Sequence, residues 1–148
     1  MYIFRKRFFI SWVLSSLVMF AISYVWHGVV LNDLAKINYP LTLFLIFAGL
    51  VYFVVGFLLT RFYQSRIFSK RFKDSFINRG LAAGAIAGFV IYLVVLVMGV
   101  SVTHVLTLEY LLIDLGWQIF EQMAGGFVVA LCHVMVWDPV PLPEEVDR

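Results

Sequence analysis

Four long apolar runs constrain what this chain can fold into more than any other feature of its sequence. The runs cover residues 8–30, 41–60, 80–102 and 112–137. A helix needs about 20 apolar residues to cross a bilayer, and a helix satisfies its own backbone hydrogen bonds where no water is present. We therefore expect an all-α integral membrane protein in which residues 1–148 form a single transmembrane domain, an antiparallel four-helix transmembrane bundle.

The composition supports this class of protein and argues against others. Hydrophobic residues make up 63% of the 148 residues and charged residues only 14%, whereas soluble domains are about half apolar and a quarter charged. The single cysteine, Cys132, excludes an internal disulfide and a cysteine-rich metal or iron–sulfur centre. The sequence has no basic surface interleaved with aromatic residues, so we expect no nucleic-acid partner. The partner that the composition predicts is the lipid bilayer.

Positive charge is distributed unevenly around the four runs. Ten Lys and Arg residues precede the first run, lie in the connection 61–79 or end the chain, and only Lys36 lies on the other side. Basic loops stay in the cytoplasm, so we expect both termini and the connection 61–79 to be cytoplasmic. Trp26 and Trp117 then fall near the outer interface, and the other two tryptophans fall near the inner one, as in aromatic belts. The proline-rich, acidic tail 138–148 is expected to be extended.

The basic connection 61–79 has an amphipathic pattern. Its phenylalanines recur every fourth residue, at Phe68, Phe72 and Phe76, which places them on one face of a helix. Four basic residues flank this line: Arg66, Lys70, Arg71 and Lys73. These four residues are candidates for contact with the membrane surface or with a partner protein. The alternative is that the connection only enforces topology.

A ridge of small residues begins the third run. Gly80, Gly84 and Gly88 follow one another at a spacing of four, and small residues at this spacing let a second helix approach closely. The ridge is therefore a candidate for helix packing. Its partner remains open: another helix of the same chain, a second copy in a homo-oligomer, or another subunit of a larger membrane complex.

Polar residues gather near the outer ends of the first and fourth runs. Asp114, Gln118 and Glu121 share one stripe of a helix at about 100° per residue. An Asp at the centre of a lipid-facing helix costs roughly 2.5–3.5 kcal/mol, so other groups must cover this stripe. We expect a polar recess on the periplasmic side. Its candidate ligand-binding residues are Trp26, His27, Asp114, Trp117, Gln118 and Glu121.

Uses of this cluster other than ligand binding remain open. His27, His104 and Glu121 would suit zinc or another divalent metal ion, although the sequence lacks a spacing such as H-E-x-x-H. Haem held by two histidines is a further alternative. The simplest use is interhelical hydrogen bonding, in which Glu121 bonds to His27 or to a serine. The sequence therefore leaves the cofactor unknown.

Two short motifs resemble those of an uncharacterised bacterial family of small four-span membrane proteins, a domain of unknown function. The family carries Trp-aromatic-Gly at the end of span one, matched here by Trp-His-Gly at residues 26–28. It also carries Asp-x-Gly-aromatic at the start of span four, matched by Asp-Leu-Gly-Trp at residues 114–117. This chain departs from the family in having His27 where tyrosine is usual. The resemblance implies a multi-pass protein of the bacterial inner (cytoplasmic) membrane and adds no reaction.

The expected function is non-enzymatic. We expect a ligand-binding or accessory subunit of a membrane complex, with its polar recess on the periplasmic side. The alternative is an oligomeric transporter or channel in which Glu121 binds the moving cation or proton, because one four-span bundle is a thin wall for a pore. A membrane enzyme is the third possibility. It ranks behind the other two because no serine stands in a glycine-flanked turn and no phosphate-binding loop occurs.

Overall fold

The fold is built from helices. The computed structural model describes residues 6–136 except residues 37, 39, 74 and 103–106. The described elements, in chain order, are α1 (Lys6–Tyr24), the π-helical turn η1 (Val25–Val30), the 3-10 turn η2 (Asp33–Lys36), α2 (Leu41–Tyr63), α3 (Arg66–Arg71), α4 (Phe76–Val102) and α5 (Leu108–Met135). The tail 138–148 and His104 lie outside the described residues.

Four of these helices are long and apolar enough to cross a membrane: α1 with η1, α2, α4 and α5. The all-helical fold and the four membrane-length helices are thus confirmed, and they fit a multi-pass membrane protein. Helices α4 and α5 begin at Phe76 and Leu108, earlier than the apolar runs that start at residues 80 and 112. A helix can extend through polar residues when no glycine or proline stops it. At the start of α4 the Ser75 hydroxyl caps the helix by accepting a hydrogen bond from the backbone N–H of Asn78 at 3.2 Å.

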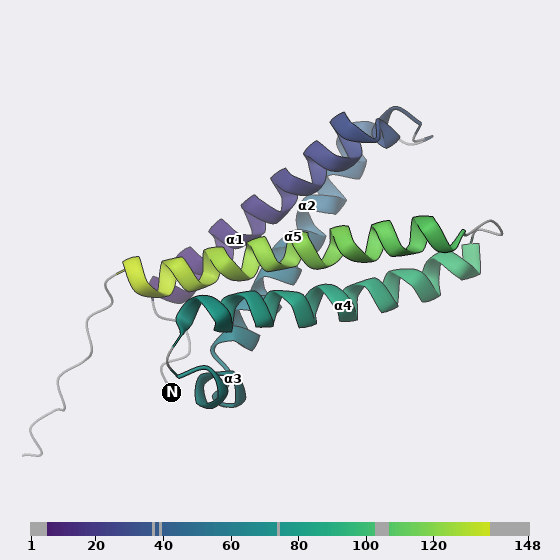
Figure 1. Cartoon of the computed structure of the whole chain (residues 1–148). Helices are drawn as coiled ribbons and strands as arrows, with labels where there is room; N and C mark the ends of the chain where they lie inside the picture. Colours follow the sequence, from purple (N-terminus) through teal and green to yellow (C-terminus); the bar gives the residue numbers. More distant parts are fainter. Residues whose placement is uncertain (1–5, 37, 39, 74, 103–106, 137–148) are drawn as a thin grey trace, which may run out of the picture.

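Helices α4 and α5 pack closely and run in opposite directions (Figure 1). A Cβ atom added at Gly80 would lie 2.8 Å from the Ala130 Cβ, and one added at Gly88 would lie 2.8 Å from the Gln118 carbonyl oxygen. At Gly84 the nearest backbone belongs to Gln122 and Met123. The glycine ridge therefore lies against the backbone of α5, in a contact that leaves no room for side chains.

Helix α1 packs against both α5 and α2, and α2 also contacts α4 and α5 directly. Met19 of α1 contacts Gly125 of α5, and the Ser16 side chain occupies the space beside Gly56 of α2. Met19, Leu59 and Val129 belong to the buried core that joins the three helices. In Figure 1 the helices meet near the end that carries α3, whereas the α1–α2 end and the α4–α5 end lie apart. The core is therefore concentrated toward the α3 end.

Basic side chains close two helices at this α3 end. The Arg7 Nε donates to the Val136 carbonyl at 3.0 Å, and the Arg79 Nε donates to the Tyr63 carbonyl at 2.7 Å. The last carbonyls of a helix lack partners within the helix, and a cation near them is favourable. These two arginines, read from the sequence only as topology signals, therefore also cap α5 and α2.

The short helix α3 buries its aromatic face within the protein. The Phe68 ring lies 4.4 Å from the Phe62 ring and 5.7 Å from the Phe72 ring, measured between centroids. The four basic residues singled out from the sequence, Arg66, Lys70, Arg71 and Lys73, are all exposed. Phe68 thus packs on the end of α2. The prediction of one helical face of phenylalanines is wrong, because α3 ends at Arg71 and Phe76 begins α4, where it is 41% exposed. The basic side chains remain available at the surface.

Candidate functional site

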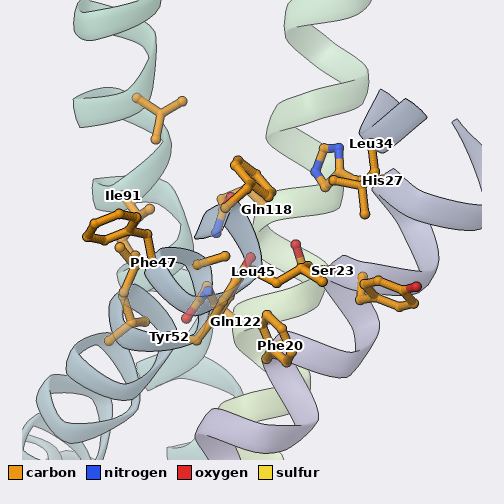
Figure 2. A pocket seen from close by; sticks show the side chains of 16 residues that line it. Phe20, Ser23, His27, Leu34, Leu45, Phe47, Tyr52, Ile91, Gln118 and Gln122 are labelled. Carbon is orange, nitrogen blue, oxygen red and sulfur yellow. The ribbon is translucent and has the colours of Figure 1, made fainter. Parts of the chain in front are cut away.

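A cavity of about 480 Å³ lies among the ends of α1 and η1 and the facing sides of α2, α4 and α5 (Figure 2). This volume falls within the usual range of small-molecule sites, about 300–1,000 Å³. Most of its wall is apolar and comes from α2 and α4, as with Leu45, Val55 and Ile91. The cavity can therefore hold a largely apolar molecule.

The polar side chains of the cavity come from η1, which contributes His27, and from three helices. Ser23 comes from α1, Tyr52 from α2, and Gln118 and Gln122 from α5. The two glutamines are four residues apart, so they project from the same face of α5, and Figure 2 shows them on the cavity side of that helix. We call Ser23, Tyr52, Gln118 and Gln122 the polar floor of the cavity.

Glu121 lies behind the polar floor and is only 1% exposed. The Tyr52 and Ser23 hydroxyls lie within hydrogen-bonding reach of its carboxyl group, and the Gln122 Nε2 donates to its Oε1 at 3.2 Å. A carboxyl group away from water is costly unless it is hydrogen-bonded. These polar groups come from α1, α2 and α5, so Glu121 joins three helices at one point.

Within the described residues, three buried side-chain polar atoms lack a hydrogen-bond partner: the indole nitrogens of Trp26 and Trp117, and the Oε1 of Gln122. The two indole rings stack at 4.0 Å between centroids with a 12° angle between their planes, which joins η1 to α5. The Trp117 indole nitrogen faces Glu121 without forming a hydrogen bond of normal geometry. Unpaired buried polar atoms are uncommon in native proteins and call for an explanation.

The structure separates the six predicted ligand-binding residues into groups. His27 and Gln118 line the cavity, Glu121 supports its floor, and Trp26 and Trp117 stack on each other. Asp114 is exposed and does not line the cavity. It lies near the start of α5, where α1 has already moved away from α5 (Figure 1), so the stripe predicted from helical spacing is covered only in its deeper part.

Three residues that complete the site, Tyr52, Ser23 and Gln122, were not among the six predicted from the sequence. A hydroxyl in the middle of an apolar run, such as that of Tyr52, is itself a signal for a buried polar partner. The Tyr52 and Ser23 hydroxyls lie within hydrogen-bonding reach of Glu121, and a serine was one of the two partners considered for this carboxyl group.

In the part of the chain that the structure describes, no three His, Cys, Asp or Glu side chains gather to hold a metal ion. The metal candidate His104 lies outside the described residues. The site as described offers hydroxyl, amide and imidazole groups around one carboxyl group. Such a set can orient a polar group of a ligand through hydrogen bonds.

A second polar cluster surrounds His133 at the α3 end. The His133 Nδ1 lies 2.9 Å from the Val129 carbonyl oxygen, and its Nε2 lies 3.0 Å from the Gln64 Nε2. A carbonyl can only accept and an amide nitrogen can only donate. The ring therefore carries its proton on Nδ1 and accepts at Nε2, so this histidine joins α5 to the end of α2.

Comparison of the chain with protein-family models, curated proteins and solved structures finds no match. The resemblance to the family of small four-span membrane proteins therefore rests on its two short motifs.

Proposed function

We propose that this protein binds an apolar small molecule or lipid within the membrane, as a non-enzymatic ligand-binding or accessory subunit. The observation that carries this proposal is the cavity of about 480 Å³ with apolar walls and a polar floor. Such a site accepts the apolar part of a molecule along α2 and α4 and its polar part at α5. The resemblance to the four-span bacterial family fits the same proposal, with the inner membrane as the location.

The exposure of the cavity wall supports access from the bilayer rather than from water. Three side chains that line the cavity are also more than half exposed: Phe47 at 59%, Val51 at 60% and Val95 at 56%. These side chains are apolar and belong to membrane-length helices, so the surface they expose suits hydrocarbon. A ligand dissolved in the bilayer can therefore reach the cavity between α2 and α4 without crossing a polar surface.

The proposed orientation follows from the basic residues. With both termini and the connection 61–79 in the cytoplasm, the four spans form an antiparallel bundle and the cavity lies in the periplasmic half of the membrane. The arginine caps and the exposed basic residues of α3 then lie together on the cytoplasmic side. This distribution of basic residues matches the positive-inside rule.

Transport by an oligomer, with Glu121 as the cation or proton site, is the alternative function. The polar groups around Glu121 come from three helices of one chain, and Glu121 itself is not among the residues that line the cavity. This arrangement favours a structural role for Glu121 over conduction. The mass of the purified protein in nanodiscs tests the alternative, because a strictly monomeric protein without partners would contradict it.

A matched pair of substitutions on α2 tests the proposed function. Ala48 lines the cavity, whereas an added Cβ at the adjacent Gly49 meets nothing within 4 Å. We expect wild-type protein purified from native membranes to retain an apolar molecule that extraction and mass spectrometry detect. Ala48→Leu fills part of the cavity and should lose that molecule, whereas Gly49→Leu should keep it. Equal retention by both variants, or no retained molecule in wild type, would contradict the proposal.

A further inference from the structure

The orientation of one buried amide indicates what kind of polar group the cavity accepts. We infer that the bound molecule is an amphiphile whose polar end donates a hydrogen bond, as an ammonium or hydroxyl group does, to the Gln122 Oε1. This inference rests on the proposed function and specifies the ligand of the same cavity.

Glu121 fixes the direction of the Gln122 amide. The Gln122 Nε2 donates to the Glu121 Oε1 at 3.2 Å, and only the nitrogen end of an amide can donate to a carboxylate. The amide oxygen must therefore point elsewhere. Gln122 lines the cavity, and its Oε1 has no partner among the described residues. Glu121 thus fixes the orientation of an amide in the cavity wall whose oxygen is left without a partner.

Gln122 is only 1% exposed, so its oxygen is packed within the floor, and a ligand reaches it only when neighbouring side chains of the floor move aside. A buried carbonyl without a partner is costly, and roughly 90% or more of buried polar groups in native structures are paired. The surrounding wall is mostly apolar and the cavity faces hydrocarbon along α2 and α4, so the ligand itself is the natural source of the missing donor. Gln118 does not discriminate between polar groups, because its amide can both donate and accept.

The charges near the polar floor favour a positive or neutral group over a negative one. The Glu121 carboxyl group lies behind Gln122, and no Lys or Arg is present among the residues that line the cavity. An anionic group would therefore face the Gln122 oxygen and the Glu121 carboxyl group, and of the residues that line the cavity only His27 carries a group that can bear a positive charge. We expect an ammonium to bind best, a hydroxyl next and a carboxylate least.

Three probes with the same ten-carbon chain test this order: decylamine, decanol and decanoate. Each is added at the same mole fraction in the micelle, and native mass spectrometry counts the molecules bound per protein chain. We expect decylamine to bind more tightly than decanoate by about tenfold or more, as expected for one hydrogen bond to a charged group. Decanol should lie between them.

Two variants separate the polar contact from the apolar one. Gln122→Met keeps the length of the side chain but removes the acceptor, together with the Nε2 donor to Glu121, so it should reduce the preference for decylamine over decanoate to about twofold or less. Leu45→Ala removes apolar wall and should weaken all three probes by a similar factor, leaving the preference unchanged.

The outcomes distinguish this inference from the proposed function. If decanoate binds to wild type as tightly as decylamine, the inference is wrong while the cavity still binds amphiphiles. If Gln122→Met keeps the full preference for decylamine, Gln122 is not the acceptor and the inference is again wrong. If none of the probes binds, the proposed function fails as well. The order of the three probes on wild type decides the question even if Gln122→Met does not fold.

Discussion

The contact between α4 and α5 predicts an unusual response to one added methyl group. In Gly84→Ala the new Cβ would lie 2.6 Å from the Met123 Cα. Carbon atoms pack best at about 3.5–4.0 Å, so the two backbones must separate locally by roughly 1 Å. Because the obstacle is backbone rather than a flexible side chain, no rotamer change relieves it.

The expected magnitude follows from two opposing effects. Overpacking a tight contact costs about 1–3 kcal/mol, whereas replacing glycine by alanine in a helix gains up to about 1 kcal/mol. We therefore expect Gly84→Ala to lower the free energy of unfolding by about 1–2 kcal/mol. Gly49→Ala is the matched control, because a Cβ at Gly49 meets nothing within 4 Å; it should be neutral or stabilising by up to about 1 kcal/mol.

Unfolding by increasing mole fractions of sodium dodecyl sulfate in mixed micelles, followed by circular dichroism, measures both variants under the same conditions. A second readout is retention of the apolar molecule, because the backbone that meets the new Cβ carries Gln122 and so shifts the polar floor. If Gly84→Ala is as stable as Gly49→Ala, the close approach of α4 to α5 is not as tight as described and the reasoning is refuted.

Three further predictions concern the contacts that hold the site and the α3 end together. Tyr52→Phe removes one hydroxyl from the surroundings of buried Glu121 and should cost about 1–3 kcal/mol of unfolding free energy in the same titration; an unchanged value would show that the carboxyl group does not depend on this hydroxyl. Alanine substitutions of Trp26 and Trp117, singly and together, should give a coupling energy of about 0.5–1.5 kcal/mol in a double-mutant cycle, and strict additivity would contradict the stacking. His133→Ala leaves the side-chain amide of Gln64, which follows α2, without its acceptor and should lower the free energy of unfolding by about 1–3 kcal/mol. The bound apolar molecule should be retained, which mass spectrometry can check.

The polar stripe on α5 was predicted from helical spacing, and the structure covers only part of it. Spacing placed Asp114, Gln118 and Glu121 on one face, and the expense of a lipid-facing carboxyl group required that face to be covered. Glu121 is covered and only 1% exposed, whereas Asp114 is exposed. Spacing gives the direction of a side chain on its helix. It does not give the point along the helix at which a neighbouring helix departs.

The sequence by itself determined the secondary structure and the number of membrane-length helices. A single chain segment that crosses the hydrocarbon core must satisfy its own backbone hydrogen bonds, and a helix does so. It also predicted the small residues that let α4 approach another helix. Only the tertiary structure decided that the Tyr52 and Ser23 hydroxyls lie against Glu121, and that the Gln122 oxygen is left without a partner. These contacts depend on where α1 and α2 cross α5, and that crossing is set by close packing at Gly56 and Gly125, about one helical turn from Tyr52 and Glu121.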